Sequence, residues 1–424
     1  MIKTVSRKIK SVCGRQVFDS RGIPTVEATV VLEDGSVGIA SVPSGASTGK
    51  YEAHEKRDGD DGFNGKSVYA AANAIGSDLK EAIEGIDATN QDTVDRKMIE
   101  KDGTDNKRRY GANSILAVSL ATARAAADSY SMPLYQYLGG VNAALMPIPL
   151  MNILNGGAHA SNNLDIQEFM IMPVGAHSFA HAMKIGCETY AALKKLLLEK
   201  GYSVAIGDEG GFAPDLKSDE EALELIVDAI EYAGYIPEKD VALALDVAAS
   251  EWSNGNDYLL PKKNKLMTVD DLFSHYEKLL SNYPILSIED PFGEEDFPAF
   301  ARFTTRHKNL QIVGDDLFVT NKERLKQGIL QKSGNAILIK PNQIGSLSET
   351  IETVSIATQS HFNTIISHRS GETEDCFIAD LSVALNSGQI KTGAPCRGER
   401  LAKYNRLLKI ENQLGSKARY GLFK

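Results

Sequence analysis

The chain has 424 residues, 42% of them hydrophobic, and a formal net charge of −10 at pH 7. This length allows two domains with sizeable cores, and the negative charge argues against nucleic acid or an anionic membrane as the main partner. The sequence contains no run of 18 apolar residues, so it predicts no membrane-spanning helix. The basic N-terminus lacks the apolar stretch of a secretory signal, and four scattered cysteines are typical of reduced thiols, so we expect a cytoplasmic protein.

The first part of the chain predicts a small α+β domain. Residues 15–43 alternate apolar and polar side chains, and Asp34-Gly35 between two such runs is typical of a hairpin. Two helical stretches follow, at 65–85 and 106–130, and the second is rich in alanine. We place the domain boundary between residues 138 and 139, so that residues 1–138 form one domain and 139–424 the other.

From about residue 147 short apolar runs alternate with amphipathic helical segments, among them 218–234, 268–280 and 346–360. Six successive runs end in a charged or polar group: Asp246, Glu289, Asp315, Lys340, His368-Arg369-Ser370 and Lys391. A β/α barrel builds its active site from many strand ends in this way, whereas an open doubly wound sheet uses one crevice. We therefore predict an α/β fold with a C-terminal (β/α)8-type barrel.

Three of these strand ends are carboxylates, Asp246, Glu289 and Asp315. Converging carboxylates repel one another, and a hard divalent cation such as Mg²⁺ or Mn²⁺ removes the conflict. Any one of them alone is better explained as a solvated loop acid. Their succession on adjacent strands favours a metal site.

The next strand ends are cationic: Lys340, Arg369 and Lys391. Cations beside a carboxylate-bound metal predict a pocket for an acidic substrate, in which Arg369 grips phosphate or carboxylate. Lys340 has two interpretations. It is either a structural lysine whose ammonium reaches water, or a catalytic base. The surrounding pattern favours a base that removes a proton next to a carboxylate, with a pKa depressed by the nearby positive charge.

Upstream loops supply further candidates. The stretch at 207–214 carries Glu209, and 155–170 carries His159, Gln167 and Glu168. Two adjacent carboxyls can be tuned so that one stays protonated as a general acid. The Ser/Gly loop 43–50 fails the phosphate-loop pattern but is a candidate lid whose Ser47 reaches a metal.

The motifs resemble those of the enolase family nearly end to end. They include "VPSGASTGKYEAHEKRDGD", "LNGGAHASNNLDIQEFMIMP", "GDEGGFAP", "SIEDPF", "LIKPNQIGS", "SHRSGETED" and "IKTGAPCRGERLAKYN". The resemblance implies a glycolytic lyase, phosphopyruvate hydratase, that reversibly dehydrates 2-phospho-D-glycerate to phosphoenolpyruvate. It also implies an irregular ββαα(βα)6 barrel beneath an N-terminal cap with a three-stranded sheet, and a homodimer or an octamer of dimers.

The resemblance implies a role for each candidate. Lys340 takes the C2 proton, and Glu209, supported by Glu168, protonates the leaving hydroxyl. Two Mg²⁺ ions bind per site, the first on Asp246, Glu289 and Asp315 and the second, with substrate, on Ser47. The substrate-binding set is His159, Gln167, Glu168, Glu289, Asp315, His368, Arg369, Ser370 and Lys391, in which Arg369 and Ser370 bind the phosphate.

One departure stands beside the base: Pro341 replaces an ordinary apolar residue and biases Lys340 toward extended geometry. Two alternatives stay open on sequence alone. One is an enolase paralogue acting on another phospho- or phosphonocarboxylic acid, and the other is a binding or scaffold protein without turnover. A secondary cell-surface pool, as some enolases have, is also compatible with the sequence.

Overall fold

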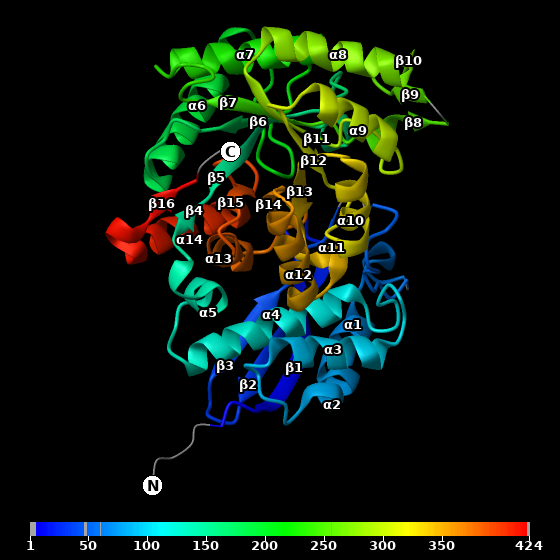
Figure 1. Cartoon of the computed structure of the whole chain (residues 1–424), viewed down its shortest axis with the longest axis vertical. Coiled ribbons are helices and arrows are strands. Elements are labelled where there is room, and N and C mark those ends of the chain that lie inside the picture. Colours follow the sequence, from blue (N-terminus) through cyan, green and yellow to red (C-terminus); the bar gives the residue numbers. More distant parts are fainter. Residues whose placement is uncertain (1–5, 46–48, 60, 256, 422–424) are drawn as a thin grey trace.

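The structure is a computed structural model that describes residues 6–45, 49–59, 61–255 and 257–421. Its centre is a closed eight-stranded barrel with the strand order β11-β12-β13-β14-β15-β5-β6-β7 (Figure 1). The strands are β5 (Ile148–Asn155), β6 (Glu168–Met172), β7 (Ala242–Asp246), β11 (Ile285–Glu289), β12 (Gln311–Gly314), β13 (Ala336–Ile339), β14 (Asn363–Ser367) and β15 (Gly388–Lys391).

The start of the barrel is irregular in strand direction. Strand β6 runs antiparallel to both of its neighbours, β5 and β7, whereas the other barrel pairs are parallel. Two helices, α6 (Phe179–Glu199) and α7 (Asp219–Tyr232), follow β6 before β7 begins. The later units each add one strand and a covering helix. The predicted ββαα(βα)6 barrel is therefore confirmed.

The outer helices begin where the sequence places capping residues. The side chains of Ser218 and Ser346 accept hydrogen bonds at the starts of α7 and α12, and Thr268 forms a capping box with Asp271 at α8. The remaining helices of this part are α8 (Val269–Asn282), α9 (Phe297–Arg306), α10 (Lys322–Gln331), α11 (Pro341–Ile344), α12 (Leu347–Gln359), α13 (Phe377–Ala384) and α14 (Gly398–Leu414). The helices predicted at 218–234, 268–280 and 346–360 are thus present.

The N-terminal part is the predicted α+β unit. Its antiparallel sheet has the order β1-β2-β3, with β1 (Ile9–Phe18), β2 (Pro24–Leu32) and β3 (Val37–Ser41). The Asp34-Gly35 turn joins β2 to β3, and Gly35 adopts a φ of 92° there. The helices are α1 (Tyr69–Ala74), α2 (Lys80–Ile83), α3 (Gln91–Asp102), α4 (Ala112–Ser129) and α5 (Leu134–Gly139).

The alanine-rich α4 packs directly on this sheet. A Cβ at Gly38 of β3 would lie 1.9 Å from the carbonyl oxygen of Ala121, so only glycine fits at this crossing. Small side chains on both elements let the helix and sheet approach closely, which explains the composition of 106–130. The helix itself starts six residues later than predicted, at Ala112, after Gly111 with a φ of 95°.

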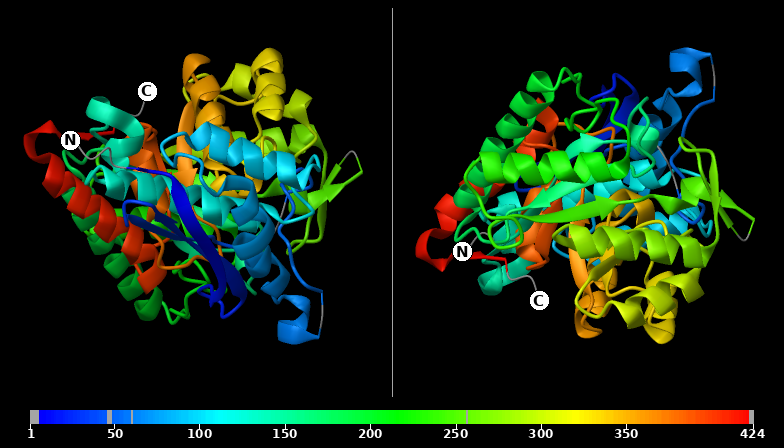
Figure 2. Two further views of the ribbon diagram at one scale, coloured as in Figure 1. Left: turned by 90° about the horizontal axis from the view of Figure 1, so that it is seen from below. Right: turned by 90° about the horizontal axis from the view of Figure 1, so that it is seen from above.

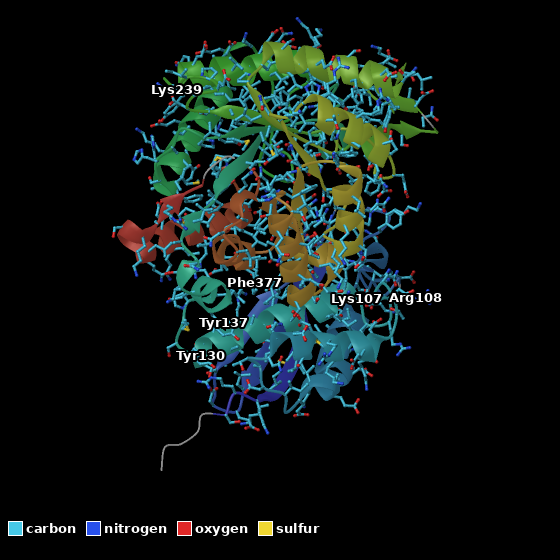
Figure 3. All side chains as sticks on the ribbon, in the orientation of Figure 1. Lys107, Arg108, Tyr130, Tyr137, Lys239 and Phe377 are labelled. Atoms are coloured by element: carbon cyan, nitrogen blue, oxygen red, sulfur yellow. The ribbon has the colours of Figure 1, made fainter. Side chains whose placement is uncertain are left out.

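The N-terminal unit covers one side of the barrel, and Figure 2 shows its sheet and helices from below. Ser44 pairs with Gly371 through two backbone hydrogen bonds of 2.8 and 2.9 Å. The Arg124 guanidinium of α4 binds Asp375 and lies 5.3 Å from the ring centroid of Phe377. Phe377, labelled in Figure 3, is the first residue of α13. These contacts bring the N-terminal unit to the loop that follows β14.

Short strands complete the structure: β8 (Ser253–Asn254), β9 (Asp257–Leu260) and β10 (Lys265–Met267) form a small sheet, and β4 (Leu145–Met146) pairs with β16 (Arg419–Tyr420). Within the described ranges, no helix is both long and apolar enough to cross a membrane. The predicted domain boundary falls at the end of α5 and stays a prediction.

Candidate active site

A cavity with about 550 Å³ of open space lies where the carboxyl ends of the barrel strands face the N-terminal unit. Eleven predicted site residues line it: His159, Gln167, Glu168, Glu209, Asp246, Asp315, Lys340, His368, Arg369, Ser370 and Lys391. Glu289 does not line this cavity, and its carboxylate accepts hydrogen bonds from the Lys391 ammonium. Ser47 falls outside the residues that the structure describes.

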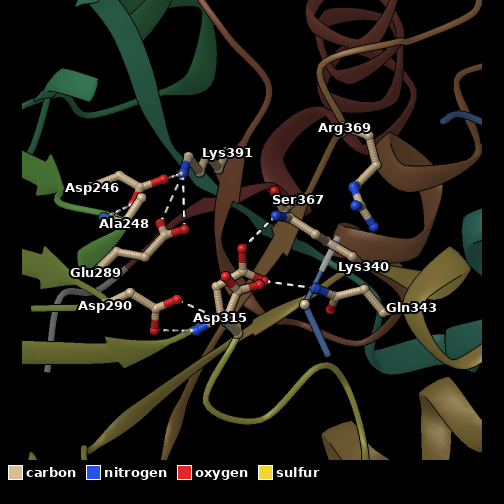
Figure 4. Close-up of polar contacts among 12 residues, drawn as sticks. Asp246, Ala248, Glu289, Asp290, Asp315, Lys340, Gln343, Ser367, Arg369 and Lys391 are labelled. Carbon is tan, nitrogen blue, oxygen red and sulfur yellow. Dashed lines mark hydrogen bonds and ion pairs between the residues drawn. The ribbon is translucent and has the colours of Figure 1, made fainter. Parts of the chain in front are cut away.

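A buried lysine holds the carboxylates of this site together. The Lys391 Nζ lies 2.8 Å from Asp246 Oδ2, 2.9 Å from Glu289 Oε2 and 3.3 Å from Glu168 Oε1 (Figure 4). The side chain of Lys391 is only 2% exposed. Burial lowers its pKa, but the surrounding carboxylates outweigh burial and raise the pKa well above the usual lysine value. Lys391 is therefore charged at neutral pH.

Lys340 lies at the end of β13 with its ammonium on Asp315 (Figure 4). Its backbone N–H donates to Thr320 Oγ1 at 2.8 Å, and its φ of −119° and ψ of 101° are extended. Pro341 occupies the first position of α11, where a missing N–H costs no helical hydrogen bond. The predicted extended geometry of Lys340 is confirmed.

The depression of the Lys340 pKa that we predict beside Mg²⁺ and Lys391 stays a prediction, and without the ion the shift has the opposite direction. Burial and the positive charges of Arg369 and Lys391 lower the pKa, but the contact with Asp315 outweighs them, and the pKa is raised. The direct contact between the Lys340 ammonium and Asp315 was not predicted. Lys340 is consequently protonated as long as Asp315 holds it.

The anion-binding candidate Arg369 is already paired with a carboxylate. Its Nη1 lies 2.9 Å from Glu52 Oε2 and its Nη2 lies 3.2 Å from Glu52 Oε1. Asn342 Oδ1 accepts a further bond from Nη1 at 3.2 Å. The Arg369 side chain is 4% exposed, so this bidentate pair is buried. Ser370 follows in the same loop and is 8% exposed.

The two candidate acid–base carboxyls, Glu168 and Glu209, have opposite pKa shifts. Burial and the charge of Glu209 raise the Glu168 pKa well above its usual range. Burial raises the Glu209 pKa as well. The interactions of Glu209 with His368 and His159 outweigh burial and hold the Glu209 pKa well below the usual range. A pair that splits in this way shares one proton, and Glu168 carries it in this arrangement.

Histidines flank this pair. His159 Nδ1 lies 3.6 Å from Glu168 Oε1, and His368 Nε2 lies 3.4 Å from Glu209 Oε2. Asn152 Nδ2 donates to the same Glu209 oxygen at 3.1 Å. Gln167 lies one residue before Glu168, and its backbone N–H donates to the Asp246 carbonyl at 3.1 Å. The loop residues predicted upstream thus converge on the barrel mouth.

The donors at the ends of β7, β11 and β12 fit a hard divalent cation. Asp246, Glu289 and Asp315 offer only carboxylate oxygens, the ligands that Mg²⁺ prefers. Among the described residues, the groups whose ligand atoms lie within 4.8 Å of one another are instead Asp290, Asp315 and Asp316, and His159, Glu168 and Glu209, so the three predicted ligands do not converge this closely in the structure. Burial and the neighbouring acids raise the Asp316 pKa to about 8. Such a rise is expected where the negative charges of crowded carboxylates repel one another.

Sequence reasoning missed several cavity residues: Glu52, Glu251, Asp290, Asp316 and Ser367. Asp290 and Asp316 directly follow predicted metal ligands, so adjacency was an available signal. Asp290 matters through its carboxylate, which accepts the backbone N–H groups of Asp315 and Asp316 at 2.9 and 2.8 Å. Glu52 carried no such signal, because its partner Arg369 lies 317 residues away.

A barrel whose strand ends combine buried lysines, paired carboxyls and an arginine defines a class of enzyme that performs acid–base chemistry on an anionic substrate. The family model described as "Enolase, N-terminal domain" matches residues 9–138, and that described as "Enolase, C-terminal TIM barrel domain" matches residues 143–422. The chain belongs to the enolase family.

Curated relatives match over almost the whole chain. A protein named enolase from Acidothermus cellulolyticus is 54% identical over 413 residues, covering 97% of this chain and 96% of the relative. Another, from Natranaerobius thermophilus, is 52% identical over 413 residues, with 97% of each chain covered. Both are named enolase, as the motifs indicated.

Proposed function

We propose that this protein is a glycolytic enolase that reversibly dehydrates 2-phospho-D-glycerate to phosphoenolpyruvate in the presence of Mg²⁺. The observation that carries the proposal is that Lys340 and the Glu168–Glu209 pair line one cavity with Arg369. The reaction needs a base for the C2 proton, an acid for the C3 hydroxyl and an anion-binding group, and this cavity offers all three.

The carboxylates of Asp246, Glu289 and Asp315 would hold the first Mg²⁺, and Ser47 would contribute to a second that arrives with the substrate. When bound, these ions supply positive charge that stabilises the extra negative charge on the substrate carboxylate.

Lys340 acts as the base that removes the C2 proton. Asp315 is the contact that keeps its pKa high, so Lys340 becomes a base once Asp315 no longer holds the ammonium. The extended backbone at Lys340 and the start of α11 at Pro341 aim the side chain from a rigid strand end.

The Glu168–Glu209 pair supplies the proton that leaves with the C3 hydroxyl as water. Ligand atoms of His159, Glu168 and Glu209 lie within 4.8 Å of one another, which is close enough for the protonation of one carboxyl to affect the pKa of the other. Glu168 stores the proton and supports Glu209, which delivers it to the hydroxyl.

The remaining cationic groups hold the substrate. Arg369 and Ser370 bind the phosphate, while Lys391 stays charged on the carboxylate side. His159, Gln167 and His368 line the substrate. We further propose a cytoplasmic protein that assembles as a homodimer or an octamer of dimers.

The proposal is tested by following phosphoenolpyruvate formation by ultraviolet absorbance from purified protein and 2-phosphoglycerate, with Mg²⁺ and with a chelator. We expect turnover that needs Mg²⁺ and is lost in Lys340→Ala. The matched control is Lys308→Ala, an exposed lysine, which keeps full activity. No turnover by folded, Mg²⁺-loaded protein would contradict the proposal.

A further inference from the structure

Arg400 of α14 is a fully buried arginine whose guanidinium reaches across the floor of the site. Its exposed fraction is 0%. Nη1 donates to the Arg369 carbonyl at 2.6 Å and Nη2 donates to the Asp208 carbonyl at 3.1 Å. Nη2 also contacts the Ser370 carbonyl. One guanidinium therefore ties together the loop that carries Glu209 and the loop that carries the anion-binding residues.

The backbone around the arginine is shaped to admit its stem. Gly393, after β15, has a φ of +80°, and a Cβ there would lie 3.0 Å from Arg400 Cδ and 2.7 Å from the Glu209 carbonyl oxygen. The Ala394 N–H donates to that same Glu209 carbonyl at 2.9 Å. The stem, the turn after β15 and the Glu209 loop are packed as one unit.

The same guanidinium determines where His368 carries its hydrogen. Arg400 Nη1 lies 2.7 Å from His368 Nδ1. A guanidinium can only donate hydrogen bonds, so Nδ1 must accept, and a neutral His368 carries its hydrogen on Nε2. That Nε2 lies 3.4 Å from Glu209 Oε2 without forming a hydrogen bond, so the Nε2–H tautomer places the only ring hydrogen on the side of the Glu209 carboxylate.

We propose that Arg400 is a positioning residue that fixes His368 as the Nε2–H tautomer and thereby keeps an N–H group available beside Glu209. This inference rests on the proposed function, in which Glu209 delivers the proton. Arg400 does not itself line the cavity, so it acts through His368 and through the loop carbonyls that it binds.

The surrounding charges agree with a neutral His368. Burial lowers its pKa, and although Glu209 opposes this, Arg400 and Lys391 lower it further, to about 3. On the Glu209 side, the carboxylate faces His368, His159, Glu168, Lys391 and the Asn152 amide. A second N–H on the ring would point at the guanidinium and be repelled, so only one tautomer fits between the two groups.

The direct test is the imidazole ¹⁵N spectrum of the wild-type protein without substrate, with the His368 signals assigned by their loss in His368→Gln. We expect a protonated Nε2 and an unprotonated Nδ1 at neutral pH. A protonated Nδ1 would overturn the proposal. Because no substrate is used, this failure is distinct from a failure of the proposed function.

Variants then test whether Arg400 sets the tautomer. Arg400→Met removes the donors, and we expect the His368 ¹⁵N pattern to change and kcat to fall about 100-fold. In a His368→Gln background the same change should cost less, because its main route of action is already gone. Unchanged ¹⁵N signals, or an equal loss in both backgrounds, would contradict the proposal.

Lys403→Met is the matched control. Lys403 is another buried cation on α14, but it binds Glu372 and the Thr373 carbonyl instead of His368. We expect a loss of stability with the His368 signals unchanged. Should Arg400→Met not fold, the wild-type spectrum can still overturn the proposal, because a protonated Nδ1 contradicts it.

Discussion

At the scale of single residues, the site is organised by buried charges that neutralise one another. Lys391 faces three carboxylates, Lys340 faces Asp315, and Arg369 faces Glu52. Each cation removes part of the repulsion among groups that water no longer screens. A metal ion or substrate that binds here must therefore compete with these existing ion pairs for the same charged side chains.

Lys391→Met tests this competition. The variant leaves Asp246, Glu289 and Glu168 without their ammonium, so we expect its free energy of unfolding to drop by about 3 to 5 kcal/mol when divalent cations are chelated. Mg²⁺ should then raise its Tm by more than it raises the wild-type Tm, because no lysine competes for the carboxylates. Calorimetry with chelator and with Mg²⁺ measures both shifts, and equal shifts would refute the idea. Lys403→Met, which removes an ammonium remote from these carboxylates, should give the wild-type shift.

Glu52→Gln tests the pair at the anion-binding arginine. The amide can keep a hydrogen bond to Arg369 but no longer neutralises it, so we expect inorganic phosphate to bind about 10-fold more tightly, equivalent to about 1.4 kcal/mol. Titration calorimetry gives the Kd. Glu55→Gln is the matched control, since Glu55 pairs with Arg57 instead. Weaker binding in Glu52→Gln would mean that the carboxylate mainly holds Arg369 in place.

The residue types of the site were predictable, but their charge partners were not. Asp246, Glu289, Asp315, Lys340 and Lys391 each end an apolar run, and parallel strands deliver such ends to one face. Which lysine lies on which carboxylate depends on side-chain reach across the barrel. The contact of Lys340 with Asp315 is one such partner, and it raises the Lys340 pKa.

At the scale of elements, the N-terminal unit is fastened to the barrel beside the anion-binding loop. The Arg124–Asp375 pair joins α4 to the segment just before α13, and Asp375 also accepts the Ser41 and Phe377 N–H groups at 3.0 and 2.8 Å. The loop that carries Arg369 and Ser370 is thus held from the side of the N-terminal unit as well as by Arg400.

Asp375→Asn probes this fastening through pH. Burial raises the Asp375 pKa, but Arg124 and the N–H donors outweigh burial and hold the pKa below its usual value. A depressed folded pKa stabilises the protein above the unfolded value, and this contribution is lost as pH falls through the folded pKa. We expect the variant to be about 3 kcal/mol less stable at pH 7 and the difference to shrink below about pH 3.8. Urea unfolding across pH measures this, and a pH-independent difference would contradict it.

Element boundaries show where sequence reasoning stops. Ser218, Thr268 and Ser346 mark helix starts through their own side chains, so α7, α8 and α12 were found closely. The stretch 65–85 is instead interrupted by a π-helical turn at Ile75–Leu79 between α1 and α2. Helical periodicity alone does not signal such an interruption.

At the scale of the whole molecule, the barrel was predictable because successive apolar runs in the sequence each end in a charged or polar residue. The antiparallel direction of β6 was predicted only from the family resemblance. Antiparallel and parallel barrel strands are equally apolar in sequence, so the residues alone do not distinguish them. The close approach of α4 to β3 at Gly38 and the reach of Arg400 are products of the assembled fold. No local pattern encodes them.

The measurement that tests the account most directly is exchange of the C2 proton of 2-phosphoglycerate with deuterium from solvent, followed by NMR alongside phosphoenolpyruvate formation. If Lys340 is the base and the Glu168–Glu209 pair the acid, Lys340→Ala loses both exchange and dehydration. Glu209→Gln then keeps measurable C2 exchange while dehydration falls by about 10² to 10⁴-fold. C2 exchange that persists in folded Lys340→Ala would contradict the central claim.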